Sequence, residues 1–129
     1  MIYLDSAATT LQKPPAVARA MARAVNHLAT PGRGGHAPAM AAAETAFACR
    51  RAAAELFQLE NPEQVVFTFN ATHGLNLAIR SLLEPGDAVV ISGYEHNAVT
   101  RPLRALGAEV RVAEASLFDR EAQLAAFER

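Results

Sequence analysis

Apolar side chains recur at helical spacing in several parts of the chain, which predicts amphipathic helices. The first helix follows Pro14 and Pro15, because proline suits the first helical position and is excluded from helix interiors. Gly107 is expected to cap the C-terminus of the fourth helix, and Asp119 the N-terminus of the last. The last helical pattern is still running at Arg129, so we expect a truncated piece of a longer protein. The five predicted helices span residues 15–28, 38–58, 72–83, 97–106 and 120–129.

Short segments rich in aliphatic residues precede or separate these helices and predict β-strands. The four predicted strands are residues 2–4, 65–67, 88–91 and 109–112. From residue 65 onwards strands alternate with helices, and such an alternation of apolar strands indicates a parallel sheet covered on both faces. The sequence therefore predicts an α/β fold, with a mostly parallel sheet and flanking helices.

Composition narrows the class of protein. The chain has 129 residues, enough for one domain, and its net charge is −1. Its 12 basic residues form no run, which argues against a nucleic-acid partner. No apolar stretch is long enough to predict a membrane span, and no signal-peptide pattern is visible. One cysteine, Cys49, cannot form an internal disulfide and is expected to be a small core residue. These features predict a cytoplasmic protein without a membrane partner.

The turn from Asn70 to Gly74 carries the first candidate chemistry. It joins a predicted strand to a predicted helix, so it places free backbone N–H groups and the Thr72 hydroxyl at a helix N-terminus. The helix dipole adds partial positive charge there, which favours a bound anion such as phosphate. An ordinary strand–helix turn capped by Asn70 or Thr72 has the same sequence, and both interpretations stay open on this motif alone.

A second candidate loop, residues 93–97, follows the next predicted strand. Ligands of open α/β sheets bind outside the carboxyl ends of the strands, so the two loops are expected to share one crevice. The second loop contains His96, and an imidazole is flat enough to stack on a ring and can transfer protons near neutral pH. The alternative is a capping or surface histidine in a tight turn.

Four motifs follow one another along the chain: YLDSAATT at residues 3–10, RGGH at 33–36, NATHG at 70–74 and YEHN at 94–97. In this order they resemble the cysteine desulfurases, the pyridoxal-phosphate (PLP) enzymes grouped with the class V aminotransferases. The resemblance extends from residue 1 to about residue 112. It implies the N-terminal part of the large domain of a fold-type-I PLP enzyme. Residues 1–14 would then contribute to the substrate side of the site, and residues 15–129 would form an incomplete PLP-binding large domain.

The resemblance also implies roles for individual residues. Ala71 and Thr72 match the positions that bind the PLP phosphate, through a backbone N–H group and the threonine hydroxyl. His96 matches the catalytic histidine that stacks over the pyridine ring and takes part in proton transfer. His73 stands where many relatives carry glutamate, so any supporting role of that glutamate is in doubt here.

On the substrate side the implied residues are Ala7, Ala8, Arg33 and His36. The two alanines would line the pocket with small side chains. Arg33 could bind a carboxylate or phosphate in bidentate fashion, and His36 could position the substrate. An exposed loop arginine and a solvated loop histidine are the open alternatives, and no metal site is predicted.

Several groups that the family needs are missing from this sequence. The only lysine is Lys13, which lies beside two prolines and lacks the Ser-x-His-Lys context of the lysine that holds PLP. The carboxylate that pairs with the pyridine nitrogen and the loop cysteine that accepts sulfur are not identifiable either. We therefore expect this chain alone to hold only half of the site, with weak, non-covalent PLP binding.

For the complete protein the resemblance implies a desulfurase that releases sulfur from L-cysteine, leaving alanine and an enzyme persulfide. Selenocysteine is an equally compatible substrate, and the expected partners are a second copy of the protein in a homodimer and a sulfur-acceptor protein. The alternatives are a class V aminotransferase of other specificity and a non-catalytic, truncated α/β module.

Overall fold

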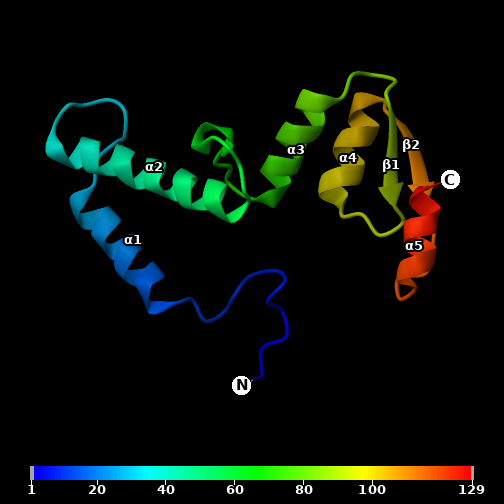
Figure 1. Cartoon of the computed structure of the whole chain (residues 1–129), viewed down its shortest axis with the longest axis horizontal. Helices are drawn as coiled ribbons and strands as arrows, with labels where there is room; N and C mark the ends of the chain where they lie inside the picture. The colour runs from blue at the N-terminus through cyan, green and yellow to red at the C-terminus, as the bar shows by residue number, and fades with distance from the viewer. Residues whose placement is uncertain (1, 129) are drawn as a thin grey trace. The chain divides into compact units, whose positions relative to one another are not determined.

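The structure is a computed structural model that describes residues 2–128, and Figure 1 traces the chain. It divides into two units, Met1–Val66 and Phe67–Arg129. In the second unit helices alternate with the two strands of a parallel sheet, so the predicted α/β class is confirmed.

The first unit contains two helices and one turn of 3-10 helix. Helix α1 (Pro15–His27) begins with proline, as predicted, and helix α2 (Ala37–Leu56) follows a loop in which Gly32 has a φ of 78°. The short helix η1 (Pro62–Gln64) contacts α2. The buried residues of α2 are all alanines, namely Ala39, Ala42 and Ala54. This unit therefore packs through small side chains.

The second unit is built around two parallel strands joined by a helix. Strand β1 (Ala88–Ser92) pairs with strand β2 (Glu109–Ala113), and helix α4 (Asn97–Leu106) connects them. Helix α3 (Ala71–Leu82) packs beside α4, and helix α5 (Arg120–Phe127) contacts β2. The parallel pairing brings the loop after β1 and the loop after β2 to the same edge of the sheet (Figure 1).

Helix α4 supplies most of the core of the second unit. Leu103 is 1% exposed, and Ala98 and Pro102 of the same helix are buried as well. The helix ends at Gly107, whose φ of 75° lies in the left-handed region that glycine adopts without strain, so the predicted cap is confirmed. Asp119 likewise caps α5, since its side chain accepts a hydrogen bond from the Ala122 N–H group.

Two of the four predicted strands are wrong. Residues 2–4 and 65–67 adopt no strand, and β1 and β2 pair only with each other among residues 2–128. A strand is stabilised by hydrogen bonds to a neighbouring strand, and among the described residues no strand pairs with these two segments. Aliphatic side chains that were expected to be buried are correspondingly exposed, as at Ile2, Leu4 and Val66.

Three further expectations are corrected. The sheet is not covered on both faces by the described residues, because Val90 and Val112 are almost half exposed. The last helix ends at Phe127, and Arg129 lies outside the described residues. Cys49 is exposed on α2 rather than part of a core.

The buried position of Leu103 predicts a large loss of stability when its side chain is truncated. Leu103→Ala should lower the free energy of unfolding by about 2–5 kcal/mol, because truncation of a buried leucine leaves a cavity in the core. Leu82→Ala is the matched control, since Leu82 is 79% exposed and its truncation should change stability by about 0.5 kcal/mol at most. Urea unfolding followed by helical circular dichroism measures both, and equal losses would contradict the packing described here.

Candidate functional site

The N-terminus of α3 is organised by Asn70. Its side-chain oxygen accepts a hydrogen bond from the His73 N–H group at 2.8 Å, and its carbonyl accepts from Gly74 at 3.0 Å. The N–H groups of Ala71 and Thr72 therefore precede the first hydrogen bond of the helix and lie at its positive end. Of the two capping residues considered from the sequence, the structure selects Asn70.

His73 stabilises this turn through contacts with Phe69. Its ring stacks on the ring of Phe69, with the ring centroids 5.3 Å apart, and its Nδ1 atom accepts a hydrogen bond from the Phe69 N–H group at 3.4 Å. Gly74 has little room for a side chain, because an added Cβ atom would lie 3.3 Å from the Thr68 hydroxyl. These contacts hold the turn against the segment that precedes it.

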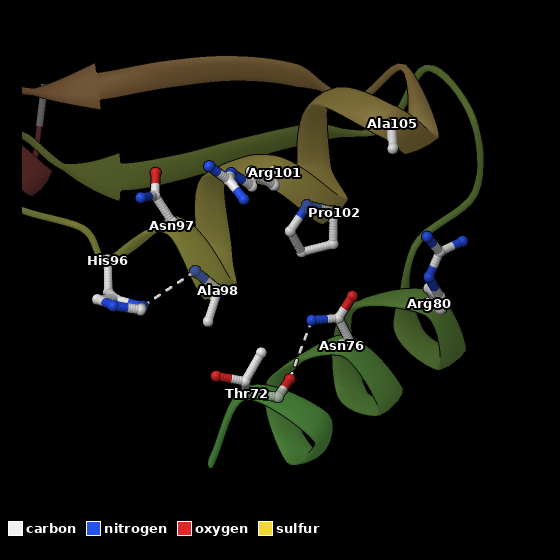
Figure 2. A pocket seen from close by; sticks show the side chains of 9 residues that line it. All are labelled: Thr72, Asn76, Arg80, His96, Asn97, Ala98, Arg101, Pro102 and Ala105. Carbon is white, nitrogen blue, oxygen red and sulfur yellow. Dashed lines mark hydrogen bonds between the residues drawn. The ribbon is translucent and has the colours of Figure 1, made fainter. Parts of the chain in front are cut away.

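His96 caps α4 with its own side chain. Its Nδ1 atom accepts a hydrogen bond from the Ala98 N–H group at 3.1 Å, which Figure 2 shows as a dashed line. A neutral imidazole has one accepting nitrogen and one that carries the proton, so this bond assigns the proton of neutral His96 to Nε2. The capping histidine considered from the sequence is therefore present, and the Nε2 side of the ring remains available to a ligand.

A hollow of about 450 Å³ lies between α3 and α4 and brings the two loops together. Figure 2 shows both helices side by side, with Thr72 and His96 toward the ends at which the helices begin. The lining side chains include two guanidinium groups and no carboxylate, so their charges suit an anionic ligand. The lining residues are Thr72, Asn76, Arg80, His96, Asn97, Ala98, Arg101, Pro102 and Ala105.

Three of the predicted cofactor-site residues thus lie in one region. Thr72 and His96 line the same hollow, and Ala71 is the neighbour of Thr72 on the first turn of α3. The donor set of this region, free N–H groups, a hydroxyl and a flat imidazole, fits a phosphorylated aromatic group.

Ala7 and Ala8 lie in a turn of the first unit. The Ala8 N–H group donates to the Asp5 carbonyl at 3.1 Å, and the Tyr3 hydroxyl donates to the carbonyls of Asp5 and Thr9 at 3.1 and 2.7 Å. The substrate-side segment therefore has a defined local shape. Its position against α3 and α4 stays a prediction, because it belongs to the other unit.

Arg33 and His36 also lie in the first unit. Arg33 is exposed in the loop before α2, and His36 is the N-cap residue of that helix without a hydrogen bond from its side chain to the helix. The His36 ring lies against Gly34, where an added Cβ atom would be 2.9 Å from two ring atoms. A side chain at position 34 would displace the imidazole, which explains a glycine there.

The Lys13 side chain is hydrogen-bonded to a nearby backbone carbonyl. Its ammonium group donates a hydrogen bond to the Thr10 carbonyl at 2.5 Å.

No group of three or more histidine, cysteine, aspartate or glutamate side chains that could hold a metal ion occurs between residues 2 and 128. None of the helices described there is long and apolar enough to cross a membrane.

The sequence interpretation missed most of the polar lining of the hollow. Asn76 and Arg80 follow Thr72 at intervals of one helical turn, and Arg101 follows Asn97 in the same way. This spacing places them on one face of each predicted helix. The signal for these residues in the sequence is their recurrence at intervals of four on the helices that follow the two loops.

Comparison with known proteins gives a consistent result. The family model described as aminotransferase class-V matches residues 2–126. A cysteine desulfurase from Cronobacter sakazakii is 37% identical over 121 residues, and one from Klebsiella pneumoniae is 38% identical over 121 residues. Each alignment covers 87% of this chain and 30% of the relative.

A solved structure is similar as well. The apo structure of a cysteine desulfurase from Thermococcus onnurineus matches with a TM-score of 0.75 at 28% identity, covering 89% of this chain and 30% of that one. The chain therefore spans about 30% of the length of the relatives that it matches.

The cap made by His96 predicts a difference between two histidines. His96→Ala should lower the free energy of unfolding by about 1 kcal/mol, because the Ala98 N–H group loses its acceptor, whereas His96→Asn should retain most of the stability. His36→Ala is the matched control, since His36 also precedes a helix but makes no capping hydrogen bond. Thermal unfolding measures all three variants, and a loss in His36→Ala as large as in His96→Ala would contradict the assignment.

Proposed function

The chain belongs to the aminotransferase class-V family, and from that premise we propose that it provides the phosphate-binding and ring-covering half of a PLP site in a cysteine desulfurase-like protein. The observation that carries this proposal is that Thr72 and His96, which begin two different helices, line the same hollow. The cysteine desulfurases among its relatives support the choice of activity within the family.

The phosphate would be held at the first turn of α3. Ala71 and Thr72 offer backbone N–H groups that precede the first helical hydrogen bond, and Thr72 adds its hydroxyl. Each hydrogen bond to a charged phosphate oxygen contributes about 1.5–3 kcal/mol, and the helix dipole adds about 0.3–1 kcal/mol. The guanidinium groups of Arg80 and Arg101 strengthen the positive potential of the hollow.

His96 would cover the ring of the cofactor. Its Nδ1 atom is engaged with the Ala98 N–H group, so the ring is oriented by α4 and presents its Nε2–H group to the ligand. PLP, when bound, supplies an electron sink for carbanion chemistry. In this site His96 would stack on the ring and would hold or move a proton at Nε2.

The remaining assignments concern the complete protein. Residues 1–14, with Ala7 and Ala8, would line the substrate side, and Arg33 and His36 would contact the amino-acid substrate. That substrate is cysteine or selenocysteine, and desulfuration of cysteine leaves alanine and a persulfide on the enzyme. A homodimer and a sulfur-acceptor protein are the proposed partners. The lysine, the ring-nitrogen carboxylate and the persulfide cysteine would come from outside this chain.

The chain alone is proposed to bind without reacting. Its single lysine donates a hydrogen bond to the Thr10 carbonyl and lacks the Ser-x-His-Lys context of the lysine that holds PLP. Binding of a phosphorylated ligand by this half-site is therefore the function that the chain can perform by itself, and turnover requires the absent lysine.

PLP affinity tests the phosphate site. We expect weak binding of PLP to the chain, and Thr72→Val should weaken it by about 1.5 kcal/mol, or roughly tenfold in Kd, because one hydrogen bond to phosphate is lost. Thr45→Val is the matched control, since the Thr45 hydroxyl donates to the Ala41 carbonyl within α2 and Thr45 is not among the residues that line the hollow. Isothermal titration calorimetry measures the affinities. Equal affinities of the wild type and Thr72→Val would contradict the phosphate site.

Borohydride reduction tests whether binding is covalent. After incubation with PLP and reduction, we expect no stoichiometric adduct on Lys13, because its ammonium group is hydrogen-bonded to the Thr10 carbonyl beside two prolines. Intact-mass and peptide mass spectrometry report the adduct. A stoichiometric adduct on Lys13 would show that this lysine can take the role assigned to one outside the chain.

A further inference from the structure

The loop between β1 and α4 is tied to the loop after β2 by one long-range hydrogen bond. The Tyr94 hydroxyl donates to the Ala115 carbonyl at 2.7 Å. Tyr94 is 53% exposed, so burial does not hold its ring in place. The hydrogen bond of its hydroxyl, called its anchor below, fixes the end of the side chain instead. The two loops leave the carboxyl ends of the paired strands, where Gly93, Tyr94, Glu114 and Ala115 line a second hollow.

A second set of hydrogen bonds joins this loop to the end of β1. The Ser92 hydroxyl donates to the Glu95 carboxylate at 2.7 Å and accepts a hydrogen bond from the Tyr94 N–H group at 3.3 Å. Ser92 is the last residue of β1, so these bonds fold the loop back onto the end of the strand. Tyr94 takes part in both sets, with its N–H group and with its hydroxyl.

His96 follows directly and is fixed from the helix side. Its carbonyl accepts hydrogen bonds from the Val99 and Thr100 N–H groups at 2.9 and 3.3 Å, and its Nδ1 atom accepts from Ala98. Only Glu95 separates Tyr94 from His96, so the path of the loop at Tyr94 bears on the direction in which the chain enters α4 at His96. The loop therefore couples the anchor of Tyr94 to the orientation of the His96 ring.

We propose that Tyr94 is a positioning residue that keeps His96 in the capped form, with Nδ1 accepting and Nε2 carrying the proton. Loss of the Tyr94 hydroxyl releases the middle of the loop, and the cap opens more often. The ring then samples other orientations and the other neutral tautomer. The consequence for catalysis rests on the role proposed above for His96, whereas the positioning itself is a property of the chain without any cofactor.

Two measurements on the ¹⁵N-labelled chain test the proposal without PLP. The ring ¹⁵N chemical shifts of His96 report its tautomer at about pH 8.5, where an ordinary imidazole is neutral. Amide hydrogen exchange of the Ala98 N–H group reports how often the cap opens. In the wild type we expect the Nε2–H tautomer to dominate.

Tyr94→Phe should lower the exchange protection of the Ala98 N–H group by about threefold to tenfold, the loss expected for one hydrogen bond, and should shift the His96 ring toward a mixture of tautomers. Ser92→Ala, which removes the other anchor and keeps Tyr94, should act in the same direction and serves if Tyr94→Phe does not fold. Tyr3→Phe is the matched control, because it removes a hydroxyl that also donates to backbone carbonyls, and it should change neither readout.

Three results would overturn the proposal. One is a wild-type His96 ring with its proton on Nδ1. Another is unchanged protection and tautomer in a folded Tyr94→Phe, or in Ser92→Ala where Tyr94→Phe does not fold. The third is an equal loss of protection at the Gly74 N–H group in α3, which would indicate general destabilisation. Failure of the chain to bind PLP would overturn the proposed function alone, because neither readout involves the cofactor.

Discussion

Two helices begin at one hollow, and the N–H groups of their first turns have no acceptor within the helices themselves. At α3 the Asn70 side chain satisfies the His73 N–H group, and at α4 the His96 ring satisfies the Ala98 N–H group. The caps do not engage the Ala71 and Thr72 N–H groups at the start of α3 or the Nε2 atom of His96. In the proposed site these groups contact the ligand. The anion affinity that we propose for the hollow follows from this constraint on helix ends.

The strands determine where the beginning of α4 lies. Parallel pairing of β1 with β2 requires a crossover, which α4 provides, and so the loop before α4 and the loop after β2 share one edge of the sheet. The hydrogen bond from Tyr94 to Ala115 joins the two loops at that edge. Sheet pairing, loop path and the orientation of a single imidazole are in this way linked along a short stretch of chain.

Local signals in the sequence predicted the helices to within two residues at most ends, because proline at position 15, the caps at Asn70 and Asp119 and the glycine at 107 act within one turn. The strands at residues 2–4 and 65–67 were wrong, since a strand depends on a neighbour that local sequence does not specify. Thr72 and His96 were found from motifs, whereas Arg101 required the helix faces to be compared. The bond from Tyr94 to Ala115 joins residues far apart in the sequence, and no local pattern predicts it.

The most direct measurement is a titration of the ¹⁵N-labelled chain with PLP, followed through its backbone amide chemical shifts. A half-site at the beginnings of α3 and α4 predicts the largest shift changes at Ala71, Thr72 and the residues next to His96. Changes confined to the surroundings of Lys13, with none at the start of α3, would contradict the placement of the phosphate at this helix end.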